Sequence, residues 1–535
     1  MDTETYLKSE RFDPLCDLFL KSTGIMKEDK YIKWTILLFL LALPFYVANV
    51  FAEAPEKPNV IFIYTDDLGY GDLSCYGGTE ILTPHIDRLA TNGLRFTNAH
   101  ATSATCTPSR YALLTGQYPW RRQGTGIARG NAGAIIAPDC FTIASMFQKA
   151  GYKTGAFGKW HLGLGGPNGP DWNGSIKPGP REIGFDYNFI LPATGDRTPC
   201  VYVENDRIAN LDPNDPIEVS YDKKVGNEPT GKENPEMLRM QLTHGHDQTI
   251  VNGISRIGYM SGGKSARWDD ETIADTLAGK AIDFIKANQN GPFFIYFATH
   301  DVHVPRVAHP RFAGKSGHGA RGDVILQLDD TVAQLVKTLE ELKLLDNTMI
   351  VFSSDNGPIV DDGYEDGSMS NIGNHKPAGP LRGSKYSKFE AGTRIPFIVH
   401  WPKRVRPDVS DALVSQIDLF ASLASLVGQK IPDAAPDSVD SLSTIIGDAK
   451  KDRDYVIEHG NWLAILSEGW KYIPARDGAP TINPPKMGGN IPVETGNLPE
   501  PQLYNMETDL VERNNVAAEH PEIVKKLDDL LTAIK

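Results

Sequence analysis

The stretch KPNVIFIYTDDLGYGDLSCYGG, residues 57–78, decides the fold. Its apolar run Val60–Tyr64 predicts a short strand, which Asp66, Asp67 and a glycine-rich loop follow directly. A strand that is apolar at successive positions is buried on both faces, as in a parallel sheet covered by helices. Polar residues at the carboxyl end of such a strand mark the edge where open α/β sheets bind ligands.

The same pattern recurs three times along the chain. The segments YKTGAFGKWHLG (152–163), PFFIYFATHDVHVP (292–305) and NTMIVFSSDNGP (347–358) each predict an apolar strand that ends in polar residues. Apolar residues at a spacing of three to four predict amphipathic helices over 324–339 and 143–147. We therefore expect an α/β fold with a large, mostly parallel sheet sandwiched by helices.

The last part of the chain has a different pattern. NWLAILSEGWKYIP (461–474) predicts an antiparallel hairpin, LYNMETDLVERNNVA (503–517) a further strand and turn, and 523–534 a terminal helix. We expect a catalytic domain over 53–407 and a smaller C-terminal subdomain, an antiparallel sheet with a helix, over 408–535.

The first 52 residues are interpreted as an upstream extension followed by a secretory signal peptide. Residues 26–33 carry three lysines, 36–47 form an apolar run that contains a proline, and 50–52 end in the small-x-small pattern of a cleavage site. The apolar run is short for a bilayer span, which takes about 20 residues. We expect a secreted protein, periplasmic or extracellular, with no membrane span after cleavage.

The net charge and the cysteine content limit the possible functions. A net charge of −14 argues against a nucleic-acid partner. Beyond the predicted cleavage site the chain has Cys75, Cys106, Cys140 and Cys200, without the spacing of a zinc site. The sequence leaves open whether Cys75, Cys140 or Cys200 form a disulfide.

Cys106 lies in SATCTPSRYALLTG (103–116), at the start of a predicted short helix. With Thr107 as N-cap and Pro108 as first helical residue, Cys106 would lie just outside a helix N-terminus, where negative charge is favoured. One interpretation is a structural, buried cysteine. The other is a site that holds an anion or attacks one.

A metal site is predicted at the sheet edge. Asp66, Asp67, Asp355 and Asn356 offer only oxygen ligands, and their carboxylates would repel one another without a cation between them. Each of them alone could instead be a helix cap or a solvated turn residue. An oxygen cage made wholly by protein favours calcium over magnesium.

Cationic and proton-transferring side chains are expected at the same edge. Lys159 and His161 are two residues apart, so in an extended segment both side chains lie on one face and can point into the crevice. His303 and Lys385 follow or lie near other predicted strands.

Taken together, these motifs are similar to those of the type I sulfatases, within the alkaline phosphatase superfamily. The resemblance rests on Cys-Thr-Pro-Ser-Arg with Leu-Leu-Thr-Gly, the aspartate pair, GKWHLG, HDVHVP, SDNGP, the Lys385 segment and LYNMETDLVERNNV. It implies an alkaline phosphatase-like fold and sulfuric ester hydrolysis. It also implies that a formylglycine-generating or an anaerobic maturation enzyme modifies Cys106 before folding, and that the hydrate of formylglycine is the nucleophile.

The resemblance also assigns roles to the site residues. It implies one calcium ion held by the modified residue 106 and the four residues of the predicted metal site. Arg110 would support the hydrated aldehyde, and Thr194 stands where the family often has a serine that touches sulfate. The remaining implied roles are sulfate binding by Lys159 and Lys385 and proton transfer by His161 and His303.

The expected substrate is a sulfated carbohydrate, because loops 192–205 and 243–253 look like those of bacterial carbohydrate sulfatases, including enzymes that act on 6-sulfated galactose or N-acetylgalactosamine. Asp196 and Arg197 are expected as a surface ion pair, with contacts to sugar hydroxyls as the alternative. Two other functions stay open at this point. One is a formylglycine-dependent phosphonate or phosphodiester hydrolase, a class that tends to carry histidine where this chain has Asn356. The other is a catalytically inactive glycan-binding homologue.

Overall fold

A ten-stranded sheet forms the centre of the computed structural model, which describes residues 57–535 except 432, 434 and 483–491. The expected signal peptide lies outside the described residues. Five strands in the middle of the sheet run parallel, and the strands beside them pair antiparallel with both edges of this group. In spatial order the five are β14 (Thr348–Ser354), β1 (Asn59–Thr65), β13 (Phe293–Ala298), β4 (Lys153–Lys159) and β5 (Tyr187–Leu191).

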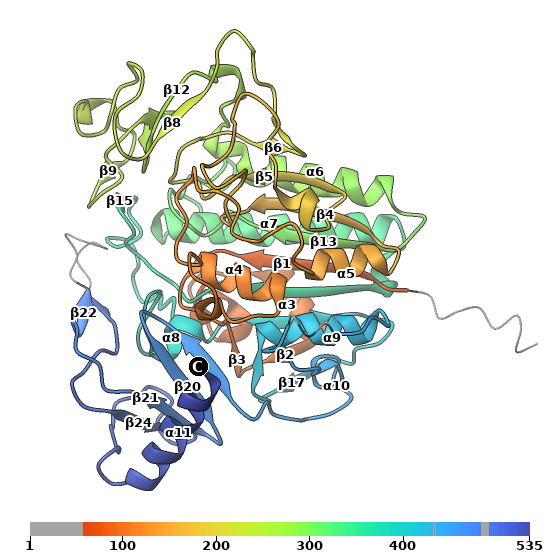
Figure 1. Ribbon diagram of the computed structural model, residues 1–535, viewed down its shortest axis with the longest axis vertical. Helices are drawn as coiled ribbons and strands as arrows, with labels where there is room; N and C mark the ends of the chain where they lie inside the picture. Colours follow the sequence, from red (N-terminus) through yellow and green to blue (C-terminus); the bar gives the residue numbers. More distant parts are fainter. Residues whose placement is uncertain (1–56, 432, 434, 483–491) are drawn as a thin grey trace, which may run out of the picture. The chain divides into compact units, whose positions relative to one another are not determined.

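The four strands predicted from sequence are therefore neighbours in this parallel group, and the expected fold class is confirmed (Figure 1). The flanking strands make the whole sheet mixed, in the order β17-β2-β16-β14-β1-β13-β4-β5-β6-β7. Their bounds are Asp408–Ser410 (β17), Leu94–Phe96 (β2), Phe397–His400 (β16), Val203–Glu204 (β6) and Arg207–Ile208 (β7).

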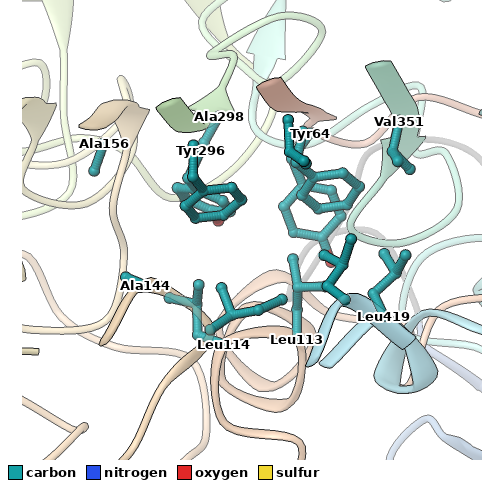
Figure 2. Close-up of a cluster of buried hydrophobic side chains, with 14 of the residues drawn as sticks. Tyr64, Leu113, Leu114, Ala144, Ala156, Tyr296, Ala298, Val351 and Leu419 are labelled. Carbon is teal, nitrogen blue, oxygen red and sulfur yellow. The ribbon is translucent and has the colours of Figure 1, made fainter. Parts of the chain in front are cut away.

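Helices cover both faces of the sheet because each strand is apolar on both faces. Along β1, Val60, Phe62 and Tyr64 belong to one core, and Ile61 and Ile63 belong to the other. The first core holds α4 (Cys106–Thr115), α5 (Ile143–Lys149) and α9 (Leu419–Leu426). The second holds α3 (Pro84–Thr91), α6 (Ile273–Ala287) and α7 (Gly319–Glu341). Figure 2 shows the first core, where Tyr64 and Tyr296 of the sheet face Leu113 and Leu114 of α4.

Helix α4 begins earlier than the sequence pattern indicates. Thr105, with an extended backbone (φ −149°, ψ 148°), is the N-cap, so Cys106 is the first residue of the helix rather than a residue outside it. Thr107, the predicted cap, lies in the first turn of the helix, where its hydroxyl donates to the main-chain oxygen of His161 over 2.9 Å and accepts from Ala128 N over 3.2 Å. Gly116 ends the helix in the left-handed conformation, with φ 67°.

A second, four-stranded antiparallel sheet lies in the C-terminal part, as expected. Its strands are β19 (Val456–His459), β20 (Leu463–Ser467), β21 (Trp470–Ile473) and β24 (Gln502–Asn505), and helix α11 (Pro521–Ile534) packs against it. The predicted hairpin turns at Glu468 and Gly469, both with positive φ. Strand β17 pairs with β2 of the large sheet, and the domain boundary at residue 408 stays a prediction.

The two long loops, over 204–252 and 361–380, contain short paired strands. Strand β8 (Glu218–Ser220) pairs with β12 (Tyr259–Ser261), and β9 (Gln241–Leu242) pairs with β15 (Tyr364–Glu365) of the second loop. In the described part of the chain the four cysteines are free thiols, and no helix there is long and apolar enough to cross a membrane.

Candidate active site

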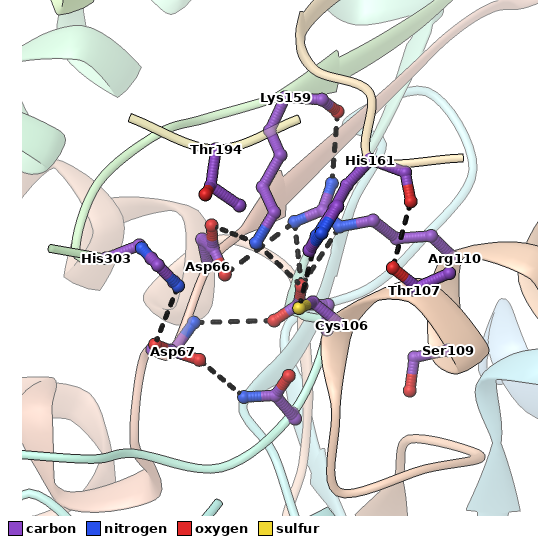
Figure 3. A network of polar contacts seen from close by, with 12 residues as sticks. Asp66, Asp67, Cys106, Thr107, Ser109, Arg110, Lys159, His161, Thr194 and His303 are labelled. Atoms are coloured by element: carbon purple, nitrogen blue, oxygen red, sulfur yellow. Dashed lines mark hydrogen bonds and ion pairs between the residues drawn. The ribbon is translucent and has the colours of Figure 1, made fainter. Parts of the chain in front are cut away.

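Two neighbouring strands end side by side at the site. In the parallel register of β1 and β14, Thr65 lies opposite Ser354. The residues that follow, Asp66 and Asp67 on one strand and Asp355 and Asn356 on the other, therefore meet at one edge, and all four are fully buried (Figure 3 shows the first pair). Asp67 has a φ of 56°, so the chain turns sharply there, and its N–H donates to Asp355 Oδ1 over 3.3 Å.

The first two carboxylates each face a lysine. Lys159 Nζ, at the end of β4, lies 2.5 Å from Asp66 Oδ2, and Lys385 Nζ lies 2.8 Å from Asp67 Oδ2. Burial raises the pKa of Asp66 well above its usual value, and Lys159 offsets this only in part. Burial acts on Asp67 in the same sense, but Lys385 and His303 outweigh it and hold the pKa of Asp67 below its usual range. Adjacent carboxyls thus have opposite pKa shifts.

Arg110 of α4 is buried and holds the third carboxylate. Its Nε and Nη2 donate to Asp355 Oδ2 over 3.0 and 2.8 Å. Its Nη1 donates to the main-chain oxygen of Lys159 (3.3 Å) and to the hydroxyl of Tyr296 (3.2 Å). Arg110 therefore fixes the ends of two strands relative to each other.

The oxygen atoms at this edge fit a hard divalent cation. Asp66 Oδ1 and Asn356 Oδ1 are buried acceptors without a hydrogen-bond partner, although buried acceptors are normally paired. Asn356 Nδ2 donates to Asp67 Oδ1 over 2.7 Å, which leaves its amide oxygen unpaired. Ligand atoms of Asp66, Asp67 and His303 all lie within 4.8 Å of one another. Such oxygen-rich acidic groups bind calcium-like ions.

Cys106 lies against this cluster and is 2% exposed. Burial raises the pKa of its thiol, although Lys159 and Lys385 act in the opposite sense. The unmodified side chain is therefore a neutral thiol at neutral pH and a weak nucleophile, since the thiolate is the reactive form.

His161 faces Cys106. Its Nδ1 is 3.3 Å from Cys106 Sγ, and its Nε2 donates to the main-chain oxygen of Ala128 over 2.9 Å (Figure 3 shows the pair). This leaves the lone pair of Nδ1 directed at residue 106. Burial, with Lys159 as the next cause, lowers the pKa of His161, so its ring is neutral.

His303 faces the cluster from the other side. Its Nδ1 donates to the main-chain oxygen of Val304 over 2.7 Å, and its Nε2 is 3.7 Å from Asp67 Oδ2. Burial lowers the pKa of His303, and Lys385 and Lys159 lower it further.

A cavity of about 420 Å³ opens beside these groups. Cys106, His303 and Lys385 line it, so a ligand there would touch three of the predicted site residues. Lys159 and Thr194 are not among the lining residues. The structure thus brings the predicted residues together and gives Lys159 and Thr194 positions behind the cavity wall.

Another part of the cavity wall holds a charged group that was expected at the surface. Arg197 Nη1 donates to Asp196 Oδ1 over 3.0 Å, and His246 Nε2 lies 3.0 Å from Asp196 Oδ2. The expectation of a surface ion pair is wrong, because the side chains of Asp196 and Arg197 are only 3% and 15% exposed. Thr194 belongs to this group, since its hydroxyl donates to Asp196 and accepts from Arg197 Nη1.

His246, which lines the cavity, is not among the site residues predicted from the sequence. Its only signal is the Thr-His-Gly-His pattern at 243–246, in a loop with no periodicity. Pairing between β9 and β15 brings this loop over the cavity.

Comparisons with known proteins agree with this geometry. The family described as Sulfatase matches residues 58–429. The N-acetylgalactosamine-6-O-sulfatase of Bacteroides thetaiotaomicron is 56% identical over 484 residues, which cover 90% of this chain and 93% of that protein. Human N-acetylgalactosamine-6-sulfatase is 30% identical and aligns over 78% of this chain and 71% of its own length.

One solved structure is similar to this chain in both sequence and fold. It comes from work on the metabolism of multiple glycosaminoglycans by Bacteroides thetaiotaomicron and superposes with a TM-score of 0.87 at 56% identity. The match covers 90% of this chain and 99% of that one, so it includes the large sheet and the C-terminal sheet together.

Proposed function

The chain belongs to the sulfatase family and is a sulfuric ester hydrolase, and on this premise we propose that it removes the 6-O-sulfate of N-acetylgalactosamine, or of galactose, in a sulfated glycan. The observation that carries the proposal is the cavity that joins Cys106, His303 and Lys385 to the buried wall of Asp196 and Arg197. Such a polar wall suits the hydroxyls of a sugar better than an apolar leaving group. The name of the relative at 56% identity supports the choice of sugar.

The metal proposed for the sheet edge is one calcium ion. Asp66, Asp67, Asp355 and Asn356 would hold it, and the unpaired oxygens of Asp66 and Asn356 support this. When bound, the ion neutralises charge on the sulfate oxygens. Lys385, which lines the cavity, and Lys159, which forms an ion pair with Asp66, would each bind a sulfate oxygen.

The proposed nucleophile is formylglycine made from Cys106. The hydrated aldehyde supplies a hydroxyl oxygen for attack on sulfur, whereas a buried thiol with a raised pKa supplies little thiolate. Because Cys106 is 2% exposed in the folded chain, a maturation enzyme would have to act before folding is complete. Export by a signal peptide to the periplasm or the exterior is part of the same proposal.

Two histidines would move the protons. His161 Nδ1 points at the side chain of residue 106 and has no proton of its own, so it would accept one from that residue. His303 would protonate the leaving sugar oxygen through Nε2. A sulfate entering the cavity adds negative charge beside His303, which raises its pKa and favours the protonated, donating form.

The rival functions are not favoured. A phosphonate or phosphodiester hydrolase of the same superfamily tends to have histidine where this chain has Asn356, and the family and its relatives are sulfatases. An inactive homologue would be expected to lack the cysteine, a metal carboxylate or a lysine, and this chain has Cys106, the three aspartates and both lysines.

Desulfation of a panel of monosulfated monosaccharides tests the proposal. We expect release of sulfate from 6-sulfated N-acetylgalactosamine or galactose and much slower release from 4-sulfated N-acetylgalactosamine and from 6-sulfated N-acetylglucosamine. Faster turnover of a 4-sulfated sugar or of a phosphodiester would reject it. Mass spectrometry of the peptide with residue 106 checks the nucleophile, since conversion of cysteine to formylglycine lowers the mass by ~18 Da.

A further inference from the structure

We propose that the C-terminal sheet carries a second carbohydrate-binding position, which holds an anionic stretch of the glycan next to the sugar that loses its sulfate. The position, called here the Trp462 platform, consists of Trp462, Arg476 and Lys535. The proposal rests on the proposed function and adds to it the binding of a longer, negatively charged chain.

Trp462 is a large aromatic side chain exposed to solvent. Its exposed fraction is 40%, and it follows the turn between β19 and β20. The guanidinium carbon of Arg476 lies 4.3 Å from the ring centroid, and Lys535 Nζ lies 5.1 Å from it. The exposed part of the indole offers apolar surface to the C–H groups of a sugar, and the two cations that lie over the ring offer partners to sulfate or carboxylate groups.

Within the described residues, the cations of the platform stand apart from acidic side chains. No acidic residue in the described part of the chain forms an ion pair with Arg476 or with Lys535, although the whole chain has a net charge of −14. Beneath them lies the buried side chain of Lys388, whose Nζ donates to Asn497 Oδ1 over 3.0 Å. Burial, and next the charge of Arg476, lowers the pKa of Lys388 to about 8. Positive charge is therefore concentrated here, and a polyanion would relieve the repulsion.

A series of main-chain hydrogen bonds and one packing contact connects the platform to the catalytic cavity. Tyr386, which lines the cavity, donates its N–H to Ala104 O over 2.8 Å, and Ala104 N donates to His459 O over 2.8 Å. The next residue, Gly460, packs so closely on Ser387 and Lys388 that an added Cβ would lie 2.9 Å from Lys388 Cγ. Gly460 N in turn donates to Trp462 O over 2.9 Å. Ala104, His459 and the turn at Gly460 thus connect the wall of the cavity to Trp462.

These observations indicate which kind of ligand the Trp462 platform binds. An apolar partner would not need Arg476 and Lys535, and a free sulfate ion would not need the exposed indole. A glycan that carries sulfates or uronate carboxylates uses both, and its terminal sugar would reach the cavity while the following sugars lie on the platform. Binding there should act on the affinity for long substrates rather than on the chemical step.

The test compares a 6-sulfated monosaccharide with a hexasaccharide that has the same sulfated sugar at its non-reducing end and uronates behind it. In Trp462→Ala and Arg476→Gln, we expect kcat/KM for the hexasaccharide to fall by about tenfold, through KM, while the monosaccharide reaction stays within about twofold. Raising the ionic strength should weaken hexasaccharide binding in the unsubstituted protein more than in Arg476→Gln. Arg404→Gln, which removes an exposed arginine paired with Asp448, is the matched control and should change neither substrate.

Equal losses on both substrates, or no loss on either, would overturn the platform while the proposed function stands. If the unsubstituted protein desulfates neither substrate, the proposed function fails on its own. Titration calorimetry with the hexasaccharide then decides the platform, since binding that Trp462→Ala leaves unchanged would refute it. A self-association of the chain that both platform variants abolish, without an effect on the hexasaccharide, would show that the surface binds a second copy instead.

Discussion

Two buried clusters of charge in this molecule look alike and differ in one respect. The catalytic cluster gathers Asp66, Asp67 and Asp355 at the end of the parallel strands. The second, called here the Lys471 cluster, gathers Glu390, Glu458 and Glu512 where the C-terminal sheet packs on the segment after Lys385, and all of these carboxyls are equally buried.

The difference lies in what occupies the centre. In the Lys471 cluster, Lys471 Nζ lies 2.6 Å from Glu458, 2.9 Å from Glu390 and 3.3 Å from Glu512, in the place that a metal ion would take. In the catalytic cluster no single lysine contacts all three aspartates: Lys159 Nζ lies 2.5 Å from Asp66 and 3.9 Å from Asp355, and Lys385 Nζ lies 2.8 Å from Asp67.

This contrast separates a structural cluster from a functional one. Acidic groups with a lysine among them need no ion, although donor atoms of His100, Glu390 and Glu458 are close enough to hold one. Both clusters contain buried oxygens without a hydrogen bond, but those of Glu458 and Glu512 lie 2.6 and 3.3 Å from Lys471 Nζ. Asp66 Oδ1 lies 4.0 Å from Arg110 Nη2, and the catalytic cluster borders a cavity. Proximity of acidic residues alone would not distinguish the two.

The largest expected effect is a loss of activity without a loss of stability, caused by a change at the catalytic cluster. Cys106→Ala should lower kcat/KM on the order of 10⁴-fold or more, because it removes the nucleophile, and should leave the thermal midpoint nearly unchanged. Kinetics with a 6-sulfated sugar and thermal unfolding check this. Cys140→Ala, at a cysteine outside the site, is the matched control. Activity of Cys106→Ala within tenfold of the unsubstituted protein would exclude residue 106 from the reaction.

The sequence predicts the catalytic cluster and not the Lys471 cluster, for a physical reason. Asp66 and Asp355 each follow an apolar strand, and parallel strands bring their carboxyl ends to one edge, so local patterns suffice. Glu390, Glu458 and Lys471 come from a short helix and two antiparallel strands, and each alone resembles an ordinary exposed charge. Their burial depends on how the two sheets pack, which no local pattern encodes.

The same limit explains the errors at the site. The ion pair of Asp196 and Arg197 was expected at the surface because the loop that covers it, near His246, has no periodic signal. The pattern predicts the start of α4 two residues late because Pro108 suits a first helical position, whereas the helix begins at Cys106, directly after the extended residue Thr105.

The second prediction is the opposite of the first: stability is lost and activity is retained. Lys471→Met should destabilise the fold by about 3–5 kcal/mol, because it leaves buried carboxylates without their central cation. At temperatures where the variant is still folded, kcat on a sulfated sugar should be close to that of the unsubstituted protein. Thermal unfolding and initial rates check this, with Lys526→Met at an exposed ion pair as the control. A variant as stable as the unsubstituted protein would contradict the structural role of the Lys471 cluster.

The third prediction concerns metal removal. Chelation by EDTA should abolish activity and lower the free energy of unfolding by about 2.7 kcal/mol if calcium was present at 100 times its dissociation constant, and added calcium should restore both. Because the ion is proposed for the catalytic cluster, the loss should be equal in the unsubstituted protein and in Lys526→Met, which changes an exposed ion pair. Calorimetry before and after chelation measures it. If the chelator changes neither the free energy of unfolding nor the activity, the metal site at the sheet edge is rejected.

The smallest effect distinguishes the carboxyls within the Lys471 cluster. Lys471 and Arg394 balance Glu390 and Glu458, so the third carboxyl is in excess, and burial raises the pKa of Glu512 from 4.5 to about 8. Between these pH values the unfolded chain has released this proton and the folded chain has not, so Glu512 makes stability fall as the pH rises.

Glu512→Gln removes this titration and tests its sign. Because the glutamine is neutral like the protonated acid, the variant should match the unsubstituted protein near pH 4.5 and exceed its stability by about 1 kcal/mol at pH 5.5, a difference that grows further up to pH 8. Thermal midpoints across this range measure the difference, and Glu468→Gln, at an exposed ion pair, should show no such trend. If Glu512 were instead an ionised partner of Lys471, the variant would lose stability at pH 8, and the charge balance that defines the Lys471 cluster would be wrong.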